Sequence, residues 1–129
     1  LLDISDSILI VVGLDSLGLN GFFNTIQYFV DNDIDLNNIK YIIPNGFSLN
    51  RRAPKISLDR LTEQAAEFTA HAKVLEPLKD RSIIKNLQSD GVSVYDDENT
   101  SPRKMTAWDI SNRDLLREDL AAIFKELDI

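Results

Sequence analysis

Apolar and polar residues alternate along this chain in blocks whose lengths fit strands and helices in turn. Residues 7–14 (SILIVVGL) form an uninterrupted apolar run, the pattern of a parallel strand that is covered on both faces. Residues 17–30 place apolar side chains at helical spacing, which predicts an amphipathic helix packed on that sheet. A second strand is predicted over residues 39–43, and Pro44-Asn45-Gly46 is expected to stop it.

The rest of the chain continues this alternation. A second helix is predicted from about Ser57, and a short third strand over residues 73–77. Ser111 and Asp114 have the spacing of a capping box, so a terminal helix is expected to begin there. The order β-α-β-α-β, followed by a short helix and a long one, predicts an α/β fold with a parallel sheet and right-handed crossovers. Because the first strand is as apolar as an interior strand, we expect either further strands from an N-terminal half outside this sequence, the better interpretation, or a covering partner.

Residues 80–96 (DRSIIKNLQSDGVSVYD) join a short helix to a turn and a β-branched, aromatic run. Asp80 is expected to cap the helix, with Arg81 and Lys85 facing outward. Gly91 is expected to adopt a positive φ in the turn. Residues 92–95 (VSVY) are then expected to lie extended against the sheet region.

The composition fits one globular domain. The chain has 129 residues, of which 43% are hydrophobic and 27% charged. It contains no cysteine, which excludes disulfides, zinc-thiolate sites and thiol catalysis. Its net charge of −7 argues against a uniformly basic nucleic-acid binder, although a local basic patch remains compatible with it. No apolar run approaches the roughly 20 residues that span a bilayer.

Gly13 and Gly18 have the spacing of the two glycines in a phosphate-binding loop. Such a loop continues with Lys and Ser or Thr, which reach the phosphates and Mg²⁺. Leu19 and Asn20 stand in those places here, so a strand-to-helix turn is the better interpretation.

An acidic stretch, residues 31–37, has the spacing of the first calcium-loop positions, but Leu36 and Ile42 replace the required Gly and Glu. It is therefore predicted to be a solvated turn. His71, the single histidine, has no nucleophile or metal ligand near it in the sequence, and a position near a helix end explains it. We find no self-sufficient catalytic apparatus and no metal site.

Basic residues, in contrast, form two groups that each follow a predicted strand. Because the carboxyl ends of parallel strands share one edge of a sheet, both groups are expected to converge where ligands of α/β proteins bind. They could contact phosphates of a nucleotide or of DNA, or they could simply be solvated loop charges. The groups are Arg51, Arg52 and Lys55, and Lys79, Arg81 and Lys85.

The order of these features resembles the C-terminal half of ParA/MinD-type deviant-Walker partition ATPases. The resemblance rests on SDSILIVVGLDSLGLNGFFNTIQYFV, then YIIPN, then VLEPLKDRSIIKNLQSDGVSVYD, then the terminal amphipathic helix. It covers nearly the whole chain. Two departures are Gly13, where the family often has Pro, and the additional Pro44 before Asn45.

The resemblance implies a three-layer α/β/α P-loop NTPase-like fold, with residues 1–129 as a single α/β domain fragment that lacks the Walker A and switch regions. It implies a protein of plasmid or chromosome partition that binds ATP and Mg²⁺ when intact, forms a nucleotide-sandwich homodimer, binds DNA non-specifically and responds to a centromere-binding partner. This chain alone would neither hydrolyse ATP nor bind it tightly. The location implied is the bacterial cytoplasm, at the nucleoid and without membrane attachment.

By position, the resemblance assigns Asn45, Pro77 and Asp80 to the adenine pocket. By region, it makes five basic residues candidates for DNA contact: Arg51, Arg52, Lys79, Arg81 and Lys85. The alternative is a non-catalytic α/β interaction module whose acidic body and Phe-rich first helix bind a protein partner.

Overall fold

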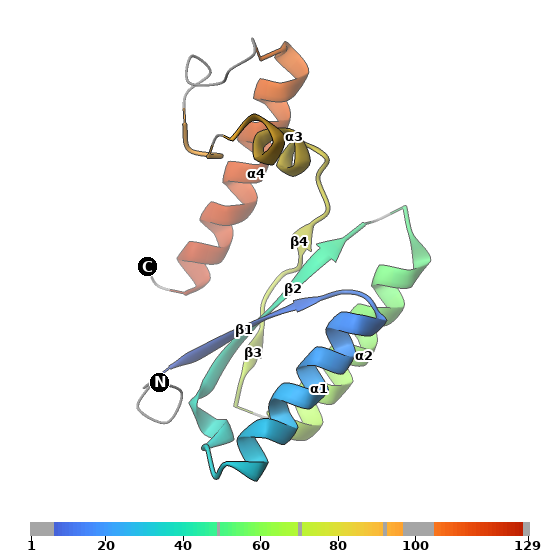
Figure 1. The fold of residues 1–129 in the computed structure, drawn as a ribbon, viewed down its shortest axis with the longest axis vertical. Coiled ribbons are helices and arrows are strands. Elements are labelled where there is room, and N and C mark those ends of the chain that lie inside the picture. The colour runs from blue at the N-terminus through green and yellow to red at the C-terminus, as the bar shows by residue number, and fades with distance from the viewer. Residues whose placement is uncertain (1–6, 49, 70, 92, 97–104, 128–129) are drawn as a thin grey trace. The chain divides into compact units, whose positions relative to one another are not determined.

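The computed structural model of the chain describes residues 7–48, 50–69, 71–91, 93–96 and 105–127 (Figure 1). The chain divides into two compact units, Leu1–Lys79 and Asp80–Ile129. We call them the sheet unit and the helical unit, and each is described by itself. The expectation of a single domain stays a prediction.

The sheet unit is built on a parallel β-sheet. Strand β1 (Ile8–Gly13) pairs with β2 (Ile39–Phe47) in parallel, in a register that runs from Ile8 opposite Ile39 to Gly13 opposite Asn45. Two short strands, β3 (Lys73–Val74) and β4 (Leu78–Lys79), pair with β2 in parallel as well. The predicted α/β class with a parallel sheet is therefore confirmed.

Two helices, α1 (Ser16–Asp31) and α2 (Arg52–Phe68), cover one face of this sheet (Figure 1). Each follows a strand and leads to the next parallel strand in sequence, and successive right-handed crossovers in one direction place both helices on the same face. The ring of Phe23 on α1 meets that of Phe68 on α2 edge to face, with centroids 5.9 Å apart. A second helical layer on the other face, which the three-layer fold requires, stays a prediction.

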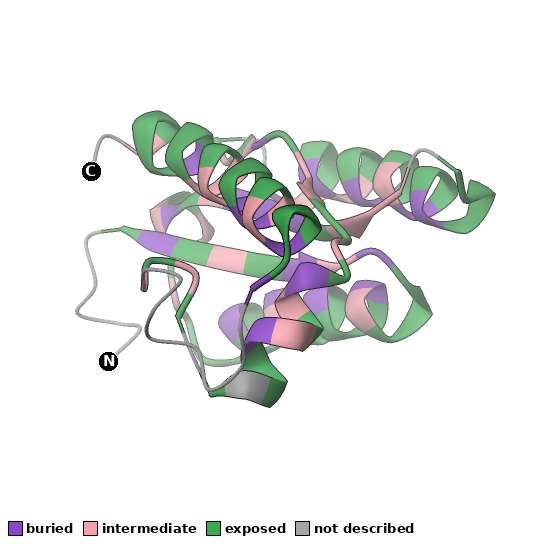
Figure 2. Cartoon of the chain, turned by 90° about the horizontal axis from the view of Figure 1, so that it is seen from above, coloured by how far each residue is buried: buried purple, intermediate pink, exposed green. Residues whose placement is uncertain are grey.

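The core of the sheet unit lies between the sheet and these helices, since it joins residues of β1 and β2 to residues of α1 and α2. Each helix is accordingly buried along one side and exposed along the other (Figure 2). A short 3₁₀ helix, η2 (Leu36–Asn38), leads from α1 into β2. The buried core side chains are Ile8, Val12, Leu14, Leu19, Phe22, Ile26, Phe29, Ile39, Ile42, Leu61 and Ala65.

Strand β2 continues through Pro44, so the prediction that Pro44-Asn45-Gly46 ends it is wrong. The backbone oxygen of Asn45 accepts from the Leu14 N–H (2.8 Å) on the β1 side, whereas that of Ile42 accepts from Leu75 (2.9 Å) on the β3 side. Successive residues of a strand point their backbone groups to opposite sides, so the missing N–H of Pro44 falls on the β3 side. That is the gap between the end of β3 and the start of β4, where no ladder bond is lost.

The predicted third strand over residues 73–77 is instead two short strands separated by residues 75–77. Pro77 has no N–H to donate, which explains an interruption here. Pairing resumes at Leu78, which lies opposite Asn45. Beyond it, Gly46 adopts a positive φ of 94° where the register with β4 shifts.

Helix α2 begins at Arg52, several residues before the predicted start at Ser57. Pro54 lies in its first turn, where backbone N–H groups have no partner within the helix and proline is tolerated. The earlier start brings Arg52 and Lys55 into the first turn.

The helical unit contains α3 (Ile83–Asp90) and α4 (Ala107–Glu126). Its core joins Ile83 and Leu87 of α3 to Leu116 of α4, with partly buried Ile84, Val94 and Leu120 against them. Gly91 ends α3 with φ 68° and ψ 29°, which confirms its predicted positive φ. None of the described helices is both long and apolar enough to cross a membrane.

Three local predictions in this unit are wrong. Ser82, and not Asp80, is the N-cap residue of α3, and no side-chain hydrogen bond caps that helix. Helix α4 is capped by Thr106 and Asp109 in a complete capping box, so Ser111 and Asp114 lie inside the helix.

The third concerns the predicted extended segment 92–95, of which residue 92 lies outside the described residues. Residues 93–96 form a turn, in which the Ser93 N–H donates to the Asp96 carboxylate (2.8 Å) and the Asp96 N–H donates to the Ser93 carbonyl (3.1 Å). The short polar side chains satisfy the backbone locally, which outweighs the strand propensity of Val94 and Tyr95.

Two glycines of α1 give a paired test of the packing between β1 and α1. A Cβ on Gly18 would lie 2.0 Å from the Gly13 carbonyl oxygen, whereas a Cβ on Gly21 would meet nothing within 4 Å. We expect Gly18→Ala to lower the free energy of unfolding by about 3 kcal/mol. We expect Gly21→Ala to raise it by up to about 1 kcal/mol, because alanine favours helix. Urea titration followed by circular dichroism measures both, and changes of the same sign would contradict this packing.

Candidate nucleic-acid interface

The carboxyl end of the sheet brings together two of the residues predicted to contact adenine. Asn45 lies opposite Gly13 on one side and Leu78 on the other, so Pro77 immediately precedes its ladder partner. The backbone of Asn45 is engaged in the sheet through the bond from Leu14, while its side chain is exposed. Asp80 is exposed and belongs to the helical unit, so the structure does not unite it with the other two.

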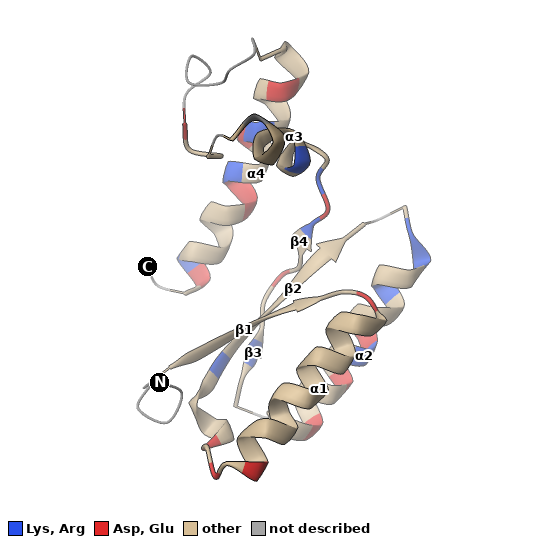
Figure 3. Ribbon diagram, in the orientation of Figure 1, with Lys and Arg blue, Asp and Glu red and all other residues tan. Residues whose placement is uncertain are grey.

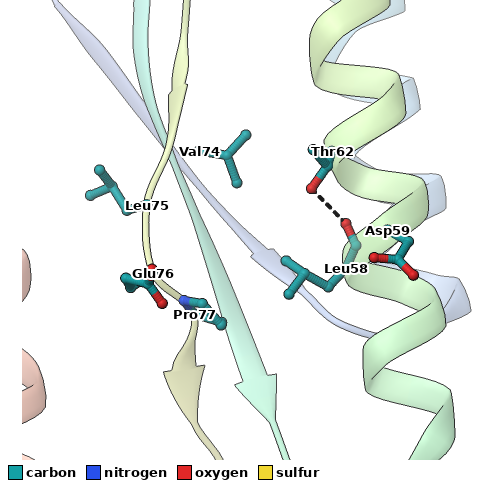
Figure 4. A pocket seen from close by; sticks show the side chains of 7 residues that line it. All are labelled: Leu58, Asp59, Thr62, Val74, Leu75, Glu76 and Pro77. Carbon is teal, nitrogen blue, oxygen red and sulfur yellow. Dashed lines mark hydrogen bonds between the residues drawn. The ribbon is translucent and has the colours of Figure 1, made fainter.

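Pro77 also lines an open pocket of about 280 Å³ between α2 and the segment that joins β3 to β4 (Figure 4). The Thr62 hydroxyl donates to the Leu58 carbonyl oxygen (2.9 Å) at its edge. The carboxylates of Asp59 and Glu76 make this pocket unsuitable for phosphate groups, since they would repel them. The lining comprises Leu58, Asp59, Thr62, Val74, Leu75, Glu76 and Pro77, and Asn45 is not part of it.

The first basic group lies at the start of α2. Arg51 is the N-cap residue, Arg52 is the first helical residue, and Lys55 follows within the first turn. The first turn contains no acidic residue, and the Arg51 side chain does not cap the helix by accepting from one of its N–H groups. Since a helix N-terminus carries a partial positive charge, cations there are unfavourable by themselves, and an anion would relieve them.

Lys79 joins this group from a different element. It lies in β4 opposite Phe47, the last residue of β2, and is exposed. Figure 3 shows Lys and Arg on β4 and at the start of α2, which follow the carboxyl ends of paired strands. The sheet unit thus carries Arg51, Arg52, Lys55 and Lys79 at one edge, as the strand order predicts for this unit.

The remaining basic candidates belong to the helical unit. The Nε atom of Arg81 donates to the Asp119 carboxylate on α4 at 2.7 Å, and these side chains are only 16% and 21% exposed. The guanidinium is thus turned toward α4 and engaged, contrary to the expectation that it faces outward, and a phosphate would have to compete with Asp119 for it. Lys85 is exposed on α3, as predicted.

Two arginines of α4 that the sequence did not single out hold the turn at residues 93–96. Arg117 donates to the carbonyl oxygens of Val94 (2.7 Å) and Asp96 (2.9 Å). Arg113 is 5% exposed and donates weakly to the same Asp96 oxygen (3.4 Å). Their i, i+4 spacing places them on one helix face. Their role in holding the turn could not be predicted, because the groups that accept from them are backbone carbonyls, which every residue has.

The two loops whose sequences partly match phosphate-binding and calcium-binding loops make hydrogen bonds within the chain instead. The Asp15 carboxylate caps α1 by accepting from the Gly18 N–H at 2.6 Å, so it occupies the position that a phosphate would need. In the acidic turn, Asp35 accepts from the Asn37 N–H (2.9 Å) and caps η2. Within the described residues, no group of three or more His, Cys, Asp and Glu side chains is arranged to hold a metal ion. His71 is exposed and lies beyond the end of α2.

Comparison of the chain with models of known protein families, with curated proteins and with solved structures gave no significant match.

The Arg81–Asp119 pair predicts a measurable energetic coupling inside the helical unit. In a double-mutant cycle of Arg81→Ala and Asp119→Ala, we expect a coupling free energy of about 1 kcal/mol, because this charged hydrogen bond is short and partly buried. Lys85→Ala, a matched exposed control, should change the free energy of unfolding by less than about 0.5 kcal/mol. Urea unfolding measures all four variants, and a coupling indistinguishable from zero would exclude a stabilising role for the pair.

Proposed function

We propose that this chain is the C-terminal part of a ParA-like ATPase of plasmid or chromosome partition, and that its sheet unit provides a non-specific DNA contact. The observation that carries the proposal is the gathering of Arg51, Arg52, Lys55 and Lys79 at the carboxyl edge of a parallel sheet. Three of them surround a helix N-terminus whose first turn lacks acidic residues. Backbone N–H groups, the helix dipole and the cations all favour phosphate at this point.

Charge also argues for a contact of limited extent. The chain carries 21 acidic and 14 basic residues, so DNA would be repelled by most of its surface. A polyanion would therefore approach through the basic edge, and four cations can neutralise about four phosphates. Non-specific binding needs only such backbone contacts and no reading of base edges.

The nucleotide part of the proposal rests on the same edge. Asn45 has an exposed amide, and Pro77, which precedes the ladder partner of Asn45, has an apolar ring; a hydrogen-bonding group and an apolar ring are the two kinds of group that suit a purine. In the intact protein, ATP and Mg²⁺ would be held mainly by the Walker A lysines and the aspartates of the family, which have no counterpart in these 129 residues. The proposed homodimer, the centromere-binding partner and the location at the bacterial nucleoid follow from the resemblance alone.

A second candidate is the non-catalytic interaction module. What favours it is the exposure of several large apolar side chains on α1, among them Leu17, Phe23 and Tyr28. DNA binding separates the two candidates, because an interaction module has no need for a salt-sensitive affinity for duplex DNA.

The experiment is a fluorescence-anisotropy titration of a labelled duplex of arbitrary sequence, repeated over a series of salt concentrations. We expect an association constant whose logarithm falls linearly with the logarithm of the salt concentration. Arg52→Glu combined with Lys55→Glu should weaken binding about tenfold or more and reduce the slope by about 2.

The matched control is Lys40→Glu combined with Lys73→Glu, which makes the same change in net charge at the amino ends of β2 and β3. This control should bind DNA much more tightly than the edge variant. Equal losses in both variants would mean that net charge alone governs binding, and salt-independent or absent binding by the unmodified chain would refute the DNA contact.

A further inference from the structure

We draw no further inference here: the strongest candidate, the outer edge of β1 at the end of the sheet with the exposed apolar side chains of Leu9 and Val11, carries none, because nothing in the part of the chain that the structure describes shows what covers it.

Discussion

The parallel pairing of β1 with β2 is the constraint on which the rest of the sheet unit depends. Parallel neighbours cannot be joined by a tight turn, so the chain must cross over, and α1 provides that connection between Gly13 and Ile39. Right-handed crossovers then place α1 and α2 on one face and bring all the strand ends to one edge. The basic edge results from this arrangement, since the edge collects the residues that come after each strand.

The basic edge shows how local structure can concentrate charge in an acidic protein. Arg51, Arg52 and Lys55 are separated from Lys79 by more than 20 residues, yet the pairing of Phe47 with Lys79 ties β4 to the strand that leads into α2. The start of α2 then adds the partial positive charge of its backbone to the charges of the side chains. Arg81, in contrast, adds no free positive charge to a surface, because its guanidinium is paired with the Asp119 carboxylate at hydrogen-bonding distance.

Much of the sheet unit could be predicted because its apolar pattern is long and regular. The apolar pattern predicts strand β1 and helix α1 close to their observed bounds, and the place of Gly91 in a turn predicts its positive φ. Errors occurred where a tertiary neighbour decided the outcome. Pro44 is accepted in β2 because the adjacent strand is interrupted beside it, and no local pattern reveals that interruption. The predicted start of α4 is too late because two pairs, Thr106 with Asp109 and Ser111 with Asp114, have the spacing of a capping box, and only the first forms one.

The candidate site was predictable to the extent that it lies at strand ends. Grouping Arg51 and Arg52 with Lys79 needed only the expectation of a parallel sheet, whereas the engagement of Arg81 depends on which face α4 presents. Gly18 and Gly21 of α1 also show that a residue's role depends on its neighbours in the fold. Both look alike in the sequence, yet Gly18 is required by the close Gly13 carbonyl, whereas a Cβ on Gly21 would meet nothing within 4 Å among the described residues.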